Sequence, residues 1–314
     1  MKINPGCTYC LLSRIHYQSK LVTDDEDLIN RVMKECIAEL NREYDPIKTS
    51  THVGTAVHRK CFEVLENADP YFEVKKMNTQ TALELLPEIQ KLIYGADENG
   101  KAYTVKTSPE PLEKIFEKAV LAAVIGNYFD FGIMGIEASD DGFKEKFGTF
   151  FESGLDINDT KEMMKRLKNV IYLVDNCGEI VYDREVLKVI QEIQRQAKEK
   201  NESANLTLVV RGAAILTDAT MKEAEELDLA SVVDEILTTG TNAIGILMNE
   251  APKETIKAME DATLIISKGM ANYESLSDEK TFHPIAYLLR TKCEAVANSL
   301  GIEMGKSVAK LVLD

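Results

Sequence analysis

The sequence predicts an α/β fold in which a mostly helical domain, residues 1–105, precedes a three-layer α/β/α domain, residues 106–314. Three observations predict this fold. The first hundred residues place apolar side chains at helical spacing and show no strand-like alternation. After about residue 165, short apolar runs alternate with amphipathic helical stretches, which is typical of a mostly parallel sheet between helices. The length of 314 residues suffices for two ordinary domains.

The helical part contains several segments with apolar residues on one face. They span residues 24–40, 51–66 and 78–94. Turn signals at Asn67–Tyr71, which contains Pro70, and at Asn99-Gly100 bound the last of them. A further helix is expected over residues 109–125, with Ser108 as its N-cap and Pro109 in its first turn.

Short apolar runs supply the predicted sheet of about six strands. They span residues 170–174, 206–210, 233–237, 264–267, 285–289 and 308–313. Amphipathic helical stretches, such as residues 184–198 and 221–228, lie between most of these runs. The last run closely follows the Leu300-Gly301 turn, and so short a return favours an antiparallel edge strand.

Charge and hydropathy exclude several classes of partner. The chain carries 37 Lys and Arg against 52 Asp and Glu, a formal net charge of −15. This balance argues against a nucleic acid or an anionic membrane surface as partner, although a local basic pocket can still bind a small anion. No segment approaches the ~20 apolar residues of a membrane span, and the first ten residues lack the apolar core of a signal peptide. We therefore expect a cytoplasmic protein with reduced cysteines.

Polar residues collect in the loops that follow the predicted strands. Ligands of open α/β sheets bind outside the carboxyl ends of the strands, so these loops are the expected site. Carboxylates, amides, cations and glycines occupy them: Asp175, Asn176, Glu179, Arg211, Asp218, Gly240, Lys268, Gly269, Asn272, Arg290 and Lys292. Their convergence on one sheet edge is the strongest physical signal in the sequence.

The residue types in these loops suit phosphate chemistry. Asp175, Asn176 and Asp218 offer the hard oxygen ligands that a magnesium-like ion takes together with phosphate oxygens. Cations in the same loops can neutralise phosphate charge, and glycines let backbone amides approach phosphate oxygens closely. Each residue also has a structural alternative; Asp218, for example, could simply cap the helix that follows it.

Several segments resemble the motifs of the damage-control phosphatases, in the right order along nearly the whole chain. They are Cys7-Thr8-Tyr9-Cys10, Asp69-Pro70-Tyr71 with Lys75, Gly126-Asn127 with Asp130, Asp175-Asn176-Cys177-Gly178-Glu179 with Asp183, and Lys268-Gly269-Met270-Ala271-Asn272-Tyr273-Glu274. The first two resemble features of the standalone prokaryotic branch. Arg290-Thr291-Lys292 resembles an Arg-Thr-x-Lys motif shortened by one residue, which leaves open whether Lys292 takes the anchoring role.

The resemblance implies a helical domain beside a three-layer domain, and a phosphatase that uses one divalent ion: manganese, cobalt, nickel or magnesium. It implies Asp175, Asn176 and Asp218 as metal ligands. It implies small phosphorylated substrates, such as sugar phosphates or damaged phosphometabolites, bound by the segment from Lys268 to Tyr273. One branch of the family was also proposed to methylate protein carboxylates with S-adenosylmethionine.

We therefore expect a divalent-metal-dependent phosphatase for small phosphomonoesters. The residues expected to carry the chemistry are Asp175, Asn176, Glu179 and Lys268. The residues expected to bind substrate are Asn127, Asp130, Arg211, Gly240, Gly269, Asn272, Tyr273 and Lys292. Glu179 could orient a metal-bound water or only accept local hydrogen bonds. Whether such a water or Asp175 itself attacks phosphorus stays open, as do the physiological substrate, the metal and the oligomeric state.

Two other functions are open alternatives. An S-adenosylmethionine-dependent carboxyl methyltransferase would need a Gly-rich loop after the first strand and an acidic residue after the second. This chain has Asp175-Asn176-Cys177-Gly178 and Arg211 at those places, which is a poor match. A non-catalytic ligand-binding protein on the same scaffold would bind metal without turnover.

Cys7 and Cys10 have the spacing of metal ligands, but a structural zinc site needs four. The residues that could complete it are Cys36, Cys61, His16, His52 and His58. Buried reduced thiols are the alternative. Because Cys7 and Cys10 lie far in sequence from the sheet-edge loops, we expect them to matter for stability rather than chemistry.

Overall fold

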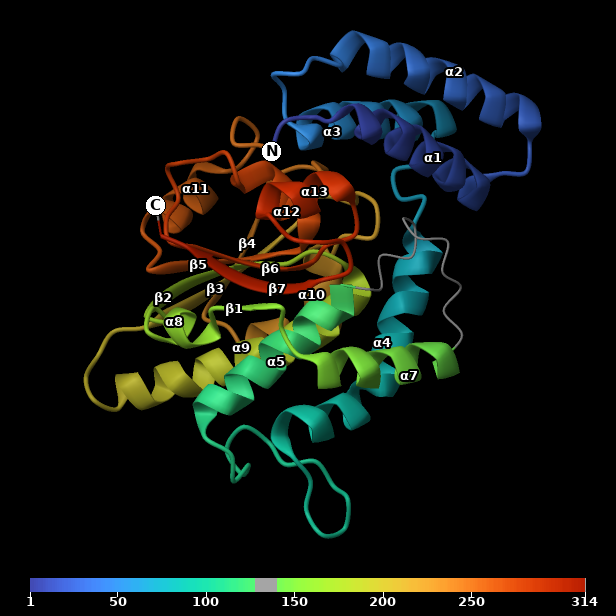
Figure 1. The fold of residues 1–314 in the computed structure, drawn as a ribbon. Coiled ribbons are helices and arrows are strands. Elements are labelled where there is room, and N and C mark those ends of the chain that lie inside the picture. Colours follow the sequence, from blue (N-terminus) through green and yellow to red (C-terminus); the bar gives the residue numbers. More distant parts are fainter. Residues whose placement is uncertain (128–139, 314) are drawn as a thin grey trace.

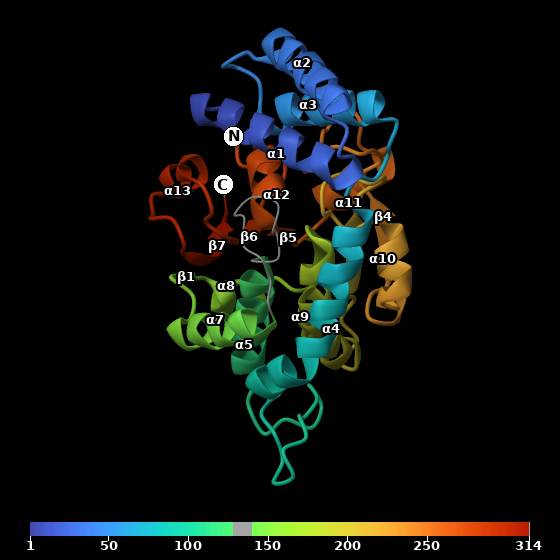
Figure 2. The same cartoon turned by 90° about the vertical axis from the view of Figure 1, so that its right-hand side faces the viewer.

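The computed structural model describes residues 1–127 and 140–313 (Figure 1). Helices α1 (Pro5–Val22), α2 (Glu26–Glu43) and α3 (Ser50–Leu65) form a layer of their own above the sheet in both views (Figures 1 and 2). Side chains of Asn4, Asp25 and Thr49 cap these helices by accepting hydrogen bonds from first-turn amides. The helices predicted over residues 24–40 and 51–66 correspond to α2 and α3.

The three N-terminal helices bury a separate apolar core, which includes Ile15, Val32, Val53 and Val57. Helix α4 (Phe72–Tyr94) is not part of this core. Its apolar residues join the core beneath the sheet, together with α5 (Leu112–Gly126) and α9 (Cys177–Lys198). The packing therefore changes between α3 and α4. The domain boundary at residues 105 and 106 stays a prediction.

Ser108 does not cap α5, so that prediction is wrong. The helix begins at Leu112, after Pro111 in extended conformation. The Ser108 hydroxyl donates instead to the carbonyl of Tyr94, 2.7 Å away, and so closes the loop between α4 and α5.

Within the described residues, one seven-stranded sheet has the order β1-β7-β6-β5-β2-β3-β4. The strands are β1 (Ile157–Asn158), β2 (Asn169–Leu173), β3 (Asn205–Val210), β4 (Glu235–Thr238), β5 (Leu264–Lys268), β6 (Ile285–Arg290) and β7 (Ser307–Val312). All neighbours pair in parallel except β6 and β7. This confirms the mixed α/β fold and the antiparallel strand, which is β7. The short strand β1 pairs in parallel with the outer side of β7.

Helices cover both faces of the sheet, as three layers require. Alternate residues of β2 point to opposite cores: Val170 and Tyr172 to the face covered by α5 and α9, Ile171 and Leu173 to the other. That other face carries α11 (Lys253–Glu260), α12 (Gly269–Leu276) and α13 (Glu294–Leu300), above the sheet in Figure 1. The remaining helices of the described ranges are α7 (Asp140–Ser153), α8 (Thr160–Met164), α10 (Met221–Glu226) and η2 (Leu229–Ser231). None of the described helices is both long and apolar enough to cross a membrane.

His58 should make the protein less stable in mild acid. Its side chain is fully buried in the N-terminal layer, with Nδ1 2.9 Å from the amide oxygen of Gln18. Burial, aided by the charge of Arg14, lowers the pKa of His58 from 6.5 to about 3. Protons therefore bind the unfolded chain first, so stability is complete above pH 6.5 and falls as the pH drops toward 3. We expect this residue to account for a loss of about 2.5 kcal/mol between pH 7 and pH 4.5.

Urea denaturation at those two pH values, compared between wild type and His58→Gln, measures this contribution. Glutamine cannot titrate, so the variant should lose less stability on acidification than wild type, whatever its stability at pH 7. Equal losses in both proteins would show that His58 is not the titrating group.

Candidate active site

A cavity of about 310 Å³ lies between the N-terminal helical layer and the carboxyl edge of the sheet. We call it the sheet-edge cavity. On the sheet side it is lined by Asn127, Asp175, Asn176 and Asp218, and on the other side by residues of α1 and α3. The loops after β2 and β3 thus meet at one opening, as the carboxyl-end rule predicts.

Backbone hydrogen bonds hold these two loops together. Residues Asn176 and Asp218 form an antiparallel bridge, and the amide of Ala219 donates to the carbonyl of Asp175 at 2.8 Å. The Asp218 side chain does not cap α10. Thr220 caps that helix in a capping box with Glu223. Asp218 lines the cavity instead.

Asn127 lies at the C-terminus of α5 and joins this group. Its side-chain nitrogen donates to Asp175 Oδ2 at 3.2 Å and to Glu179 Oε2 at 2.8 Å. Asn176 donates to the same two carboxylates, each at 3.0 Å. These bonds fix both amides, and Asn127 Oδ1 is buried without a hydrogen-bond donor in the described part of the chain.

Arg211 lies behind the carboxylates and, among the described residues, is not part of the cavity lining. It is 1% exposed; Nε pairs with Asp218, and Nη2 is 3.5 Å from Asp175 Oδ1. Nη1 donates to Asn272 Oδ1 at 2.8 Å, and Asn272 donates to the carbonyls of Val174 and Lys268. Both side chains thus hydrogen-bond to the loops after β2 and β3 or to each other, and their predicted role in substrate binding stays a prediction.

Lys268 is also buried, and it is not among the described residues that line the cavity. Its ammonium donates to Glu179, to Asp183 at 2.9 Å and to the carbonyl of Ala123 at 3.1 Å. Burial lowers the pKa of Lys268, but the two carboxylates outweigh it and raise the pKa above its ordinary value. Burial raises the pKa of Asp183 to about 6, although Lys268 and a hydrogen bond from Tyr172 oppose it.

Gly269 makes room for Asp175. Its φ is +73°, and a Cβ there would lie 1.8 Å from Asp175 Oδ2. Gly240, also at positive φ, packs instead against Glu250 and Pro252. Gly269 is predicted to let the backbone approach phosphate. The close packing of Asp175 also requires a glycine at this position.

The other predicted substrate residues have different locations. Lys292 lines the sheet-edge cavity. Tyr273 shares a 2.8 Å hydrogen bond with Ser299 and packs edge-on against Tyr287. It is not among the described residues that line the cavity. Asp130 lies outside the described residues.

Cys7 and Cys10 line the sheet-edge cavity together with Cys293, although they lie far in sequence from the sheet-edge loops. The reason is long-range packing of the N-terminus. The Met1 amine donates to the carbonyl of Glu274 in α12, and the amide of Ile3 donates to the carbonyl of Lys48 at 3.0 Å. The expectation that Cys7 and Cys10 matter for stability rather than chemistry stays a prediction.

The predicted zinc site gains no set of ligands from this packing. In residues 1–127 and 140–313, no group of three or more His, Cys, Asp or Glu side chains is placed to hold a metal ion. Cys36, Cys61 and His58 are buried in the N-terminal layer instead. The zinc site stays a prediction.

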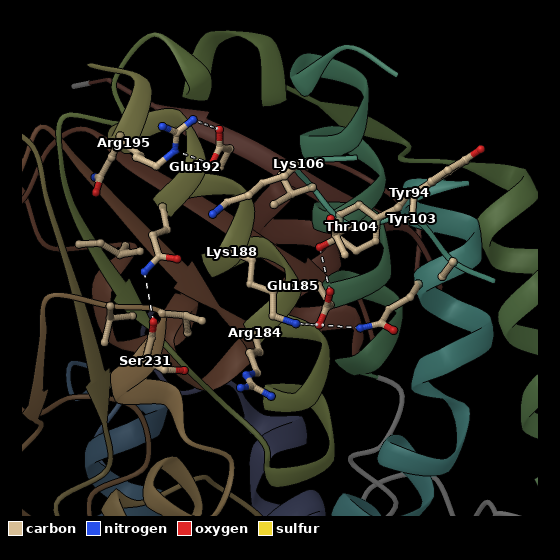
Figure 3. A pocket seen from close by; sticks show the side chains of 18 of the residues that line it. Tyr94, Tyr103, Thr104, Lys106, Arg184, Glu185, Lys188, Glu192, Arg195 and Ser231 are labelled. Atoms are coloured by element: carbon tan, nitrogen blue, oxygen red, sulfur yellow. Dashed lines mark hydrogen bonds and ion pairs between the residues drawn. The ribbon is translucent and has the colours of Figure 1, made fainter. Parts of the chain in front are cut away.

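A larger cavity of about 1000 Å³ lies elsewhere, between α4, the loop at residues 101–106 and α9 (Figure 3). Several of its charged groups pair with one another. Glu185 accepts from Tyr94 at 2.8 Å and from Lys188 at 2.7 Å, and Arg195 pairs with Glu192 at 2.7 Å. It borders the start of β3 rather than its carboxyl end, so the smaller cavity is the candidate active site.

Comparisons with known proteins relate nearly the whole chain to one family. A family model described as the damage-control phosphatase ARMT1-like domain matches residues 3–308. A damage-control phosphatase of Archaeoglobus fulgidus is 41% identical over 314 residues, which cover 99% of this chain and 100% of that protein. A damage-control phosphatase of Pyrococcus horikoshii is 27% identical, over 98% of this chain and 97% of that one.

The crystal structure of a DUF89 family protein from Pyrococcus horikoshii has the same fold. It superposes with a TM-score of 0.82 at 26% sequence identity and covers 99% of both chains. Fold, motif order and sequence identity thus agree along the whole length. The chain therefore belongs to the damage-control phosphatase family.

Proposed function

We propose that this phosphatase depends on a divalent metal ion and hydrolyses small phosphomonoester metabolites in the cytoplasm. The observation that carries the proposal is the meeting of Asp175, Asn176 and Asp218 at the sheet-edge cavity. Membership of the damage-control phosphatase family supports the phosphatase activity. The metal and the substrate class rest on the chemistry of the residues.

The donor set fits a hard divalent ion. Asp175 and Asp218 provide two carboxylates, which such an ion takes together with waters and phosphate oxygens. Asn176 Oδ1 accepts one hydrogen bond, from Thr217 at 2.7 Å, and retains a second lone pair. Asn127 Oδ1, which accepts no hydrogen bond from the described residues, is a further oxygen ligand at the cavity wall. A divalent ion bound here would polarise the phosphate and neutralise its charge.

The chain itself positions these oxygens. Glu179 accepts from the amides of Asn127 and Asn176, which sets the side on which their oxygens lie. Arg211 bridges Asp175 and Asp218 from behind and offsets their mutual repulsion. We propose that Lys268 acts through Glu179 rather than on the phosphate, because its ammonium is paired there.

The cavity is suited to a small substrate. Its volume of about 310 Å³ is at the lower end of the range for ligand pockets. Lys292 and Arg14 provide positive charge in its lining. The volume favours a compact ligand over a polymer or a nucleotide-sized one, and the positive charge favours an anionic group such as a phosphomonoester.

The methyltransferase alternative finds little support in the loop after β2. A Cβ on Gly178 would lie 2.9 Å from the carbonyl of Asn78, so this glycine permits close packing of α9 on α4. The glycine is thus explained without a cofactor. We therefore keep the phosphatase as the proposed function.

Removing metal should abolish phosphate release. Protein treated with excess EDTA and assayed with p-nitrophenyl phosphate should be inactive. Activity should return on addition of manganese, cobalt, nickel or magnesium, because the charge of Asp175 and Asp218 then has a counter-ion that also holds the phosphate. Circular dichroism before and after chelation controls for unfolding. Full activity in excess chelator, with the fold intact, would exclude the metal-dependent mechanism.

A further inference from the structure

The cysteines divide into two groups by their surroundings. Cys36, Cys61 and Cys177 are completely buried. Cys7, Cys10 and Cys293 are partly exposed and line the sheet-edge cavity beside Asp175 and Asp218. All six are free thiols. Three thiols therefore face the space that the phosphatase proposal assigns to substrate, and three are sealed from it.

The three cavity thiols come from opposite ends of the chain. Cys7 and Cys10 are three residues apart in α1, so they lie on the same face of that helix. Cys293 is the residue before α13 and follows Lys292. All three residues line the same cavity. Burial raises the pKa of Cys7, and Glu274 and the other two thiols raise it further.

The position of α1 over the cavity is held by several contacts. The Met1 amine and the Ser50 hydroxyl both bind Glu274 of α12, and Ile3 pairs with Lys48. Asn4 then caps α1 directly before the turn that carries Cys7. The thiols are thus part of an ordered wall and not of a loose terminus.

We propose that Cys7, Cys10 and Cys293 form a modification site for low-molecular-weight disulfides, whose occupation closes the phosphatase cavity. The inference rests on the proposed function of that cavity. A protein thiol attacks one sulfur of the disulfide RSSR. A protein–S–S–R bond forms, the RS–SR bond breaks, and the departing thiolate takes the proton from the protein thiol.

A second cavity thiol can complete the reaction. Cys7 and Cys10 have the Cys-x-x-Cys spacing of thiol–disulfide exchange sites. Attack by one on the mixed disulfide of the other forms a protein disulfide and releases a second RSH. In sum, two protein thiols are oxidised, one RSSR is reduced to two RSH, and both protons leave with the products.

Closure follows from the size of the cavity. At about 310 Å³, the sheet-edge cavity has little room for a substrate beside an attached thiol. The buried Cys36, Cys61 and Cys177 offer no comparable access. Modification should therefore be selective for the cavity thiols and should reduce turnover without unfolding the protein.

The test treats the folded, metal-loaded protein with cystamine and maps the products by mass spectrometry of peptides. We expect cysteamine adducts or a disulfide on the peptides of Cys7, Cys10 and Cys293, and none on those of Cys36, Cys61 and Cys177. Phosphate release from p-nitrophenyl phosphate should fall at least tenfold. Dithiothreitol should restore it.

The matched control is the triple variant Cys7→Ser, Cys10→Ser, Cys293→Ser, whose rate after cystamine is compared with its own untreated rate. That ratio should stay near one. Lack of modification at the cavity thiols, or modification without loss of rate, would overturn the inference. So would equal inhibition of the triple variant. A protein that releases no phosphate before treatment would instead refute the proposed function, and peptide mapping would still decide whether the thiols react.

Discussion

Replacing Asp175 with asparagine should lower phosphate release at least about 100-fold, which corresponds to about 2.7 kcal/mol of barrier. Asp175 is 5% exposed and lies where the loops after β2 and β3 meet. Asparagine keeps the shape that fits against Gly269 but removes the negative charge proposed to hold the metal. The hydrogen bonds from Asn127 and Asn176 can be kept by the amide oxygen, so the protein should stay folded.

Initial rates with saturating manganese, together with thermal unfolding, measure the two effects separately. Asp261→Asn is the matched control, because Asp261 is exposed and pairs only at the surface with Lys257. It should leave the rate unchanged. If Asp175→Asn kept more than about a tenth of the wild-type rate, a barrier change of only about 1.4 kcal/mol, Asp175 would not be a primary metal ligand.

The sheet and its active edge were predictable because they depend on local patterns. Each strand is a short apolar run ended by polar residues, so β2 and β3 fall within one residue of the ranges predicted for them. The carboxyl ends of parallel strands meet at one edge, and this geometric rule is enough to bring Asp175 and Asp218 together.

Burial of the charged residues was not predictable from single loops. Arg211 and Lys268 look like phosphate-binding cations in sequence, yet each is buried against carboxylates from other segments. One signal was available for Lys268: Glu179 and Asp183 are four residues apart in α9, so they face the same side. Two buried carboxylates on one helix face need a nearby cation to offset their charge.

The position of α1 depends on contacts that no local pattern reveals. Met1 and Ser50 reach Glu274 across more than two hundred residues of sequence. Separation along the chain therefore says little about where Cys7 and Cys10 lie in the fold. Their spacing was visible, but their neighbourhood was set by the packing of one layer on another.

Replacing Lys268 with methionine should destabilise the protein by about 3–5 kcal/mol at neutral pH, because it leaves buried carboxylates without their cation. Lys268, Glu179 and Asp183 are all 0% exposed, and the ammonium contacts both acids. The loss should be smaller at pH 5. A carboxyl group whose folded pKa is raised, as that of Asp183 is, destabilises the fold as pH rises through that pKa.

Urea denaturation at pH 7 and pH 5 measures this effect. The double variant Lys268→Met, Asp183→Asn should recover part of the stability, because one of the two unpaired charges is gone. Lys257→Met, which removes an exposed lysine, should cause no measurable change.

Kinetics then separate the two roles open to Lys268. A direct phosphate contact would raise KM, with stability close to wild type. A lysine that acts through Glu179 would lower kcat together with stability, because the amides of Asn127 and Asn176 lose the carboxylate position that orients them. If Lys268→Met were as stable as wild type at pH 7, the buried ion pairs would not contribute to the fold, and the phosphate contact would become the better explanation.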